Sequence, residues 1–194
     1  MDGSFPKRKA LRLKSFDYSS EGFYFVTICT QDRQCLFGAV VGAGPGAGPQ
    51  MVLNDAGYMV KSIWNEMPDY YPGVYIDEFV VMPNHVHGII SIDNRMGRGA
   101  VPAPEHAGGE TPPLQPALGR MVAYFKYQST KRINEVRETP GESVWQRNYY
   151  EHVIRNESDL NQIRQYILDN PGNWASDAEN VNAEMSLRGS RCPI

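Results

Sequence analysis

Hydrophobic residues recur along this chain in two patterns, and each pattern predicts a different kind of element. Short apolar runs rich in β-branched and aromatic residues are typical of strands. Such runs cover residues 23–29, 74–82, 85–92 and 149–154. Apolar residues spaced three and four apart form one face of an amphipathic helix. This spacing predicts helices over residues 55–67, 118–136 and about 157–170.

The order of these elements indicates the fold class. It runs strand, helix, strand, strand, helix, strand, and then one more helix. Without that last helix, this is the β-α-β-β-α-β order of ferredoxin-like domains. We therefore predict an α+β fold, in which a ferredoxin-like split β-α-β-β-α-β unit forms an antiparallel sheet and an extra C-terminal helix follows. The first and third strands should be central, which agrees with the unbroken apolar run at residues 23–29.

Polar caps and prolines set the expected ends of two helices. The expected N-caps are Asn54 for the first helix and Asn156 or Ser158 for the last. Proline lacks a backbone N–H and is uncommon inside helices. We therefore expect the first helix to end at Pro68 and the last to end at Pro171-Gly172.

Two stretches of low complexity interrupt the predicted elements. Residues 42–49 contain only Gly, Ala and Pro, and residues 97–117 are rich in Gly, Ala, Pro, Glu and Thr. Such compositions do not favour regular structure, so we expect two flexible surface inserts. We predict one domain over residues 22–174 that contains both inserts. A basic N-terminal arm (1–21) precedes this domain, and a C-terminal tail (175–194) follows it.

Composition narrows the class of protein further. The net charge is −3, so any affinity for nucleic acid would have to come from local patches. The three cysteines are scattered and odd in number, so they match neither a disulfide framework nor a zinc site and suit a reducing compartment. We find no signal peptide and no apolar run of about 18 residues. These features predict a soluble, cytoplasmic protein without a membrane partner.

The third predicted strand contains two histidines separated by one valine. Successive side chains of a strand alternate faces, so His85 and His87 should point the same way and Val86 the opposite way. Two neighbouring imidazoles on a buried strand are costly unless something binds them, and a divalent metal ion would do so. A half-exposed strand with two solvated histidines is the alternative, and spacing alone leaves both readings open.

The last predicted helix offers polar groups that could complete such a site. Tyr166 and Asn170 are four residues apart and therefore share a face of the helix. Asn170 offers a carbonyl oxygen, and Tyr166 is a possible nucleophile or general acid. Spacing alone would not single out this tyrosine among the eleven in the chain, and a packing role at the core boundary is the simpler reading of it.

Four segments together resemble a known family, the single-tyrosine HUH transposases, and among them the REP-associated tyrosine transposases and transposase-like proteins. The resemblance covers roughly residues 22–174 apart from the two inserts. Its segments are Phe25-Val26-Thr27, the run from Phe79 to Gly88, the run from Trp145 to Asn156, and Tyr166-Ile167-Leu168-Asp169-Asn170-Pro171. The order and spacing of the His-x-His, Trp-Gln-Arg and Tyr-x3-Asn-Pro segments are highly specific.

The resemblance implies a role for each residue of the candidate site. Tyr166 falls on the catalytic tyrosine of the family, and His85, His87 and Asn170 fall on its metal ligands. Some insertion-sequence relatives have Gln in place of this Asn, which favours the REP-associated branch. The implied cofactor is Mg²⁺ or Mn²⁺. The implied reaction is cleavage and rejoining of single-stranded DNA at hairpin-flanked sites, through a 5′-phosphotyrosine intermediate.

The same resemblance implies a single-stranded or hairpin DNA partner, with REP-like palindromes as possible targets. A solvated tail and solvated helix faces explain the basic residues nearly as well as phosphate binding does. His152 is a candidate helper for the phenol of Tyr166, although a structural role is the simpler reading. The candidate DNA contacts are Lys7, Arg8, Lys9, Arg12, Lys14, Lys126, Lys131, Arg132, Arg147 and Arg155.

Two other functions stay open from the sequence. One is a domesticated, non-cleaving module that binds DNA or RNA, although the complete set of site residues argues against lost chemistry. The other is a nickase of the replication-initiator type, although such relatives usually differ in motif order or carry helicase or primase regions. The family resemblance allows either a monomer or a homodimer.

Overall fold

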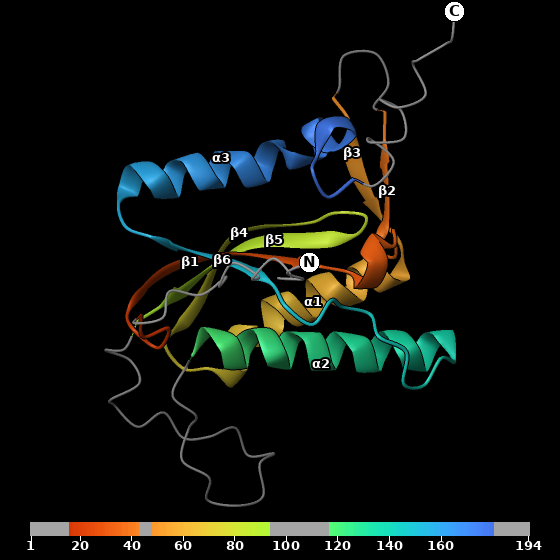
Figure 1. Ribbon diagram of the computed structural model, residues 1–194, viewed down its shortest axis with the longest axis horizontal. Coiled ribbons are helices and arrows are strands. Elements are labelled where there is room, and N and C mark those ends of the chain that lie inside the picture. Colours follow the sequence, from red (N-terminus) through yellow and green to blue (C-terminus); the bar gives the residue numbers. More distant parts are fainter. Residues whose placement is uncertain (1–15, 43–47, 94–116, 181–194) are drawn as a thin grey trace, which may run out of the picture.

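The computed structural model describes residues 16–42, 48–93 and 117–180, and its elements follow the predicted order (Figure 1). The helices are α1 (Asp55–Tyr70), α2 (Leu118–Arg137) and α3 (Glu157–Asn173). The strands are β1 (Gly22–Cys29), β2 (Gly38–Val41), β3 (Gln50–Leu53), β4 (Val74–Val81), β5 (His85–Ile92) and β6 (Tyr150–Ile154).

The main sheet confirms the predicted fold class. Within the described residues its strand order is β4-β5-β1-β6, and every pair of neighbours is antiparallel. The first and third predicted strands, β1 and β5, are therefore the central ones. Strand β1 is buried on both faces, as its unbroken apolar run predicts.

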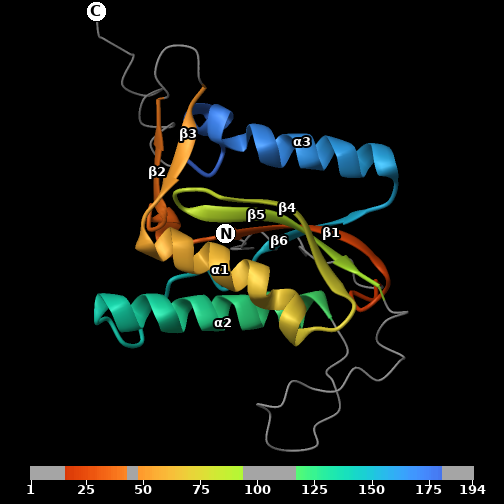
Figure 2. The same cartoon turned by 180° about the vertical axis from the view of Figure 1, so that it is seen from behind.

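Helices cover the two faces of this sheet unequally. Among the described helices, α1 and α2 pack together on one face, and only α3 crosses the other face (Figures 1 and 2). Alternation along β5 sends Val86 and Ile90 into the α1/α2 core, whereas Ile89 packs in a separate cluster with Leu160 and Ile167 of α3. His85 and His87 share the parity of Ile89, so the strand directs both imidazoles toward α3.

A glycine on the α1/α2 face allows close packing against the middle of β5. A Cβ atom on Gly88 would collide with the ring of Trp64 from α1. The indole of Trp64 is fully buried, lying parallel to Phe79 and edge-on to Phe125. The glycine directly after the His-x-His pair thus lets the largest buried side chain of the core lie against the strand.

Two expected helix ends differ from the structure. Helix α1 continues through Pro68 to Tyr70, and α3 continues through Pro171 to Asn173. A proline deletes only its own backbone hydrogen bond, and both prolines lie in the last turn, where few further bonds depend on them. The N-cap predictions are confirmed for Asn54 and Asn156, whose side chains accept hydrogen bonds from the amides of Gly57 and Asp159.

A small second sheet was not predicted. Strands β2 and β3 pair antiparallel on either side of the 42–49 stretch, where residues 43–47 lie outside the described residues. The basic residues Lys7 to Lys14 and nearly all of the predicted 97–117 insert also lie outside them. No helix in the described part of the chain is long and apolar enough to cross a membrane.

Candidate metal centre and nucleophile

His85 and His87 lie side by side on β5, buried beneath α3, with ring centroids 4.4 Å apart. Each ring has a polar neighbour at Nδ1: Oγ1 of Thr27 lies 2.8 Å from His87, and Oδ1 of Asn84 lies 2.8 Å from His85. These contacts fix the ring orientations and leave each Nε2 for another partner. Metal-binding histidines in proteins are commonly oriented in this way.

Burial determines the protonation state of the two imidazoles. It lowers the pKa of His85 to about 3, and nearby Arg33 contributes to the shift. The pKa of His87 also falls to about 3, mainly through burial and then through His85. Both rings are therefore neutral near pH 7, and a neutral imidazole has the lone pair that a metal ion requires.

Helix α3 brings Tyr166 and Asn170 to the same place. The hydroxyl of Tyr166 lies 3.2 Å from Nε2 of His87, although the residue is 47% exposed. Asn170, one turn further, is 1% exposed. The pKa of Tyr166 is raised, first by burial and then by the charge of Asp177, while the Asn170 side chain lowers it in part. The structure thus brings together four residues that the sequence singled out.

An ion pair positions the helix that carries the tyrosine. The guanidinium of Arg164 on α3 donates two hydrogen bonds to Asp77 on β4, at 2.7 and 2.6 Å. Asp77 lies where the register between β4 and β5 shifts, between Ile76 and Phe79. Such irregularities redirect side chains, and this one allows Asp77 to reach the α3 face.

The segment after α3 adds an acidic group to the cluster, the carboxylate of Asp177. The ligand atoms of His85, His87 and Asp177 all lie within 4.8 Å of one another. Sequence reasoning missed Asp177, because it falls in the predicted tail and carries no motif. It also missed Thr27 and Asn84 as partners of the histidines, although both lie within the segments that carry the family resemblance.

The donor set of this cluster fits a divalent cation. Nε2 of His85 and Oδ1 of Asn170 are both buried without a hydrogen-bond partner. Buried polar atoms in this state are costly, and a cation bound to these two atoms would remove that cost. Nitrogen from imidazole together with oxygen from an amide and a carboxylate suits Mn²⁺ or a similar divalent ion.

A cavity of about 510 Å³ opens beside the cluster. Aromatic side chains form part of its wall, with Phe25 stacked on His87 and edge-on to both Tyr150 and Tyr166. Further lining residues come from the segment after α3, among them Ser176 and Ala178. Tyr166, His87 and Asn170 therefore line one shared space.

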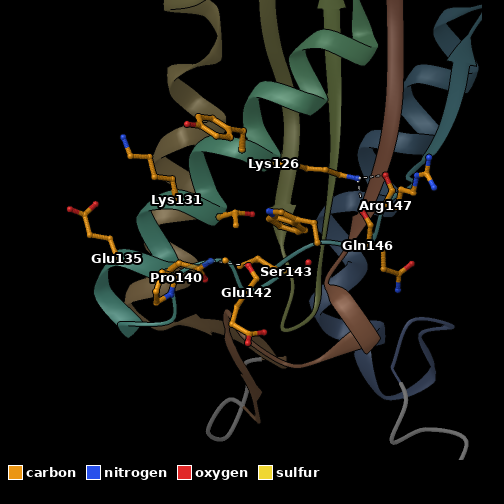
Figure 3. A pocket seen from close by; sticks show the side chains of 14 residues that line it. Lys126, Lys131, Glu135, Pro140, Glu142, Ser143, Gln146 and Arg147 are labelled. Atoms are coloured by element: carbon orange, nitrogen blue, oxygen red, sulfur yellow. Dashed lines mark hydrogen bonds between the residues drawn. The ribbon is translucent and has the colours of Figure 1, made fainter.

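Most described basic candidates lie on the opposite side of the sheet. Lys126, Lys131 and Arg147 line a cavity of about 660 Å³ between α2 and residues 140–147 (Figure 3). The ammonium group of Lys126 donates to the carbonyls of residues 146, 147 and 148, at 2.9, 3.4 and 3.1 Å. Arg132 on α2 forms a bidentate pair with Glu66 of α1. Lys126 and Arg132 thus have structural partners.

The remaining described candidates lie near the start of α3. Arg155 is exposed in the link between β6 and α3. His152 lies on β6 with its Nε2 atom 3.0 Å from Oδ2 of Asp159. The carboxylate of Asp159 belongs to the first turn of α3, so this contact joins the strand to the helix and indicates a structural role.

Comparisons with known proteins agree with the fold and the sequence motifs. No protein-family model matches the chain. An uncharacterized protein of Haemophilus influenzae is 42% identical, over 88% of this chain and 91% of its own length. A second H. influenzae protein, provisionally named a REP-associated tyrosine transposase, is 24% identical over 80% of this chain and 73% of its own length. A REP-associated tyrosine transposase solved with a REP hairpin has a similar fold, with a TM-score of 0.50, 19% identity and coverage of 82% of this chain and 70% of that chain.

Fold, motifs and relatives together define the class as that of the tyrosine transposases, with a transposase-like function. The 42% identity places the chain in one family with the first H. influenzae protein. More particularly, the chain is similar in fold and in sequence motifs to the REP-associated tyrosine transposases and transposase-like proteins.

Proposed function

We propose that this protein is a metal-dependent endonuclease and transposase for single-stranded DNA, with Tyr166 as its nucleophile. The observation that carries this proposal is the position of the Tyr166 hydroxyl, 3.2 Å from Nε2 of His87, beside buried ligand atoms without partners. A nucleophile next to a cation site in a shared cavity is the arrangement that phosphoryl transfer requires.

The proposed cation ligands are Nε2 of His85, Nε2 of His87 and Oδ1 of Asn170. Thr27 and Asn84 orient the two imidazoles, and burial keeps both neutral. When bound, Mg²⁺ or Mn²⁺ would polarise the scissile phosphate and stabilise the deprotonated form of the nearby phenol. Imidazole ligands favour Mn²⁺ over Mg²⁺, which prefers oxygen ligands.

The chemical step assigned to Tyr166 is a transesterification. Its hydroxyl oxygen bonds to the phosphorus, the bond from phosphorus to the 3′ oxygen breaks, and the phenolic proton is lost while the 3′ oxygen gains one. The products are a 5′-phosphotyrosine and a free 3′-hydroxyl. Because one phosphodiester replaces another, a second DNA end can reverse the step without an energy source. Helix α3 limits the motion of the nucleophile through the pair between Arg164 and Asp77.

We infer that the substrate is a DNA hairpin with a flanking single strand. The solved relative with the similar fold is bound to a REP hairpin, which supports this substrate class. The cavity beside Tyr166 has aromatic walls, and such walls suit unpaired bases. Arg155, exposed in the link that leads into α3, is a described basic candidate for contacting the DNA backbone.

The test uses the full-length protein with hairpin oligonucleotides that carry single-stranded flanks. With Mn²⁺, denaturing electrophoresis should reveal a covalent protein–DNA adduct, and EDTA should prevent it. Tyr166→Phe should abolish the adduct, while Tyr58→Phe, at an exposed tyrosine on α1, should not. Tight hairpin binding without any adduct would favour the non-cleaving module instead.

A further inference from the structure

We propose that Asp177 is a fourth protein ligand of the cation, and that Asn84 and Arg33 hold Asp177 in position. This inference rests on the proposed cation site and extends it by one residue, which lies beyond the segments that carry the family resemblance. Asp177 follows the 3₁₀ turn Trp174–Ser176 at the end of α3. It therefore reaches the histidines from a different segment than Tyr166 and Asn170 do.

The distances are close to those of atoms that share one ion. Oδ2 of Asp177 lies 4.0 Å from Nε2 of His85, and the ligand atoms of the two histidines and Asp177 lie within 4.8 Å of one another. Ligand atoms about 2.1 Å from a cation are roughly 3 Å apart at right angles and about 4.2 Å apart when opposite. Small side-chain movements would therefore allow all three to bind a single ion.

The carboxylate is buried, and its two oxygens have different surroundings. The Asp177 side chain is 5% exposed. Oδ1 accepts a hydrogen bond from the backbone amide of Glu179 at 2.7 Å, and Oδ2 faces His85. A buried carboxylate is costly unless a positive charge lies near it. A divalent cation between Oδ2 and the two Nε2 atoms would supply that charge.

One side chain connects the histidine to the segment that carries Asp177. Oδ1 of Asn84 contacts Nδ1 of His85, while its Nδ2 donates to the carbonyl of Glu179 at 2.7 Å and to that of Arg33 at 3.1 Å. Asn84 thus fixes the imidazole and the segment relative to each other. A shift of residues 177–180 would break the same network that orients His85.

Arg33 holds this segment from the other side. Its guanidinium donates to the carbonyl of Ala178 at 3.1 Å and pairs with the Glu179 carboxylate at 3.0 Å. The Arg33 backbone has a positive φ of 53°, a conformation that costs energy in a residue other than glycine. These contacts assign Arg33 a positioning role, since its guanidinium holds the two residues that directly follow Asp177.

The experiment measures Mn²⁺ binding to the full-length protein without DNA, by electron paramagnetic resonance of the free ion. Asp177→Asn should raise the Kd for Mn²⁺ at least about tenfold, and Arg33→Ala should raise it less, by roughly threefold. Asp169→Asn is the matched control, because this carboxylate on α3 is exposed and bonds to Gln165. Its Kd should equal that of the wild type.

An unchanged or lower Kd in Asp177→Asn, with Asp169→Asn also unchanged, would overturn the assignment. Circular dichroism and metal-free melting curves show whether each variant folds, and Arg33→Ala tests the assignment while keeping the carboxylate. DNA is absent, so the result is independent of the proposed reaction. If Asp177→Asn loses Mn²⁺ affinity but the wild type forms no covalent adduct with DNA, the proposed function is overturned. The assignment of Asp177 as a metal ligand then still stands.

Discussion

The two faces of the central sheet use the same strands for different purposes. On the α1/α2 face, β5 contributes Val86 and Ile90 to a continuous apolar core that includes Trp64. On the α3 face, the alternate residues of the same strand are His85 and His87, whose Nδ1 atoms contact polar side chains. One helix covers this face where two cover the other (Figures 1 and 2).

This difference separates stability from chemistry within one domain. The α1/α2 face buries large apolar side chains and so should supply most of the free energy of folding. The α3 face keeps two atoms of metal-binding type, Nε2 of His85 and Oδ1 of Asn170, buried without partners, whereas on the α1/α2 face Nε1 of Trp64 is in that state. Such buried atoms cost stability in the absence of a ligand. Variants on the two faces should therefore separate into those that unfold the protein and those that only inactivate it.

The largest effect on stability is expected at Trp64. Trp64→Ala removes a fully buried indole and leaves a cavity between Gly88 and Phe125, so the free energy of unfolding should fall by about 3–5 kcal/mol. Urea titration measures the loss. Tyr58→Ala, on the exposed side of α1, should cost less than about 0.5 kcal/mol. Similar losses in the two variants would contradict the assignment of the core to this face.

His87→Ala, on the other face, should have a smaller effect on stability and a complete effect on activity. The free energy of unfolding without metal should change by about 1 kcal/mol, while Mn²⁺ should no longer raise the melting temperature and no adduct should form. His152→Ala is the control, because this histidine pairs with Asp159 on the same side of the sheet. Adduct formation in His87→Ala at the wild-type rate would remove His87 from the site.

The smallest effect is expected at the ion pair between β4 and α3. Asp77→Asn should cost about 0.5–1 kcal/mol at pH 7, because the pair is partly exposed. Hydrogen bonds from Arg164 lower the pKa of Asp77, so the pair stabilises the fold above the unfolded pKa near 4 and stops doing so as the pH falls through the lower folded value.

The difference in melting temperature between wild type and Asp77→Asn should accordingly be constant from pH 7 to about 5 and shrink below about pH 4. Asp69→Asn, near the end of α1, is an exposed control for the loss of one carboxylate. A difference that grew toward low pH would show that the charge of Asp77 does not stabilise α3.

The sequence predicts the sheet, and it predicts which candidate site residues share a face of one element, for a physical reason. Alternation within a strand is a local property, so the common face of His85 and His87 follows from the chain itself. The one-turn spacing of Tyr166 and Asn170 is equally local. Their convergence with the histidines follows from the family resemblance, and residue spacing within each element does not reveal it.

Long-range partners are the part that the sequence does not reveal. From the sequence, Arg132 is a candidate phosphate contact, but in the structure it pairs with Glu66. Asp177 is predicted to lie in the C-terminal tail, but the turn after α3 places it beside His85. Neither contact follows from local periodicity. The continuation of α1 through Pro68 also depends on packing, since the neighbouring Met67 is fully buried.

The most direct test of the central claim identifies the residue that becomes linked to DNA. The Mn²⁺-dependent adduct of the full-length protein with a hairpin oligonucleotide is digested with nuclease and protease and analysed by mass spectrometry. A nucleotide on the peptide that contains Tyr166, and no adduct in Tyr166→Phe, is the predicted result. Attachment at Tyr150, the exposed tyrosine in the same cavity, or at any other residue would contradict the account.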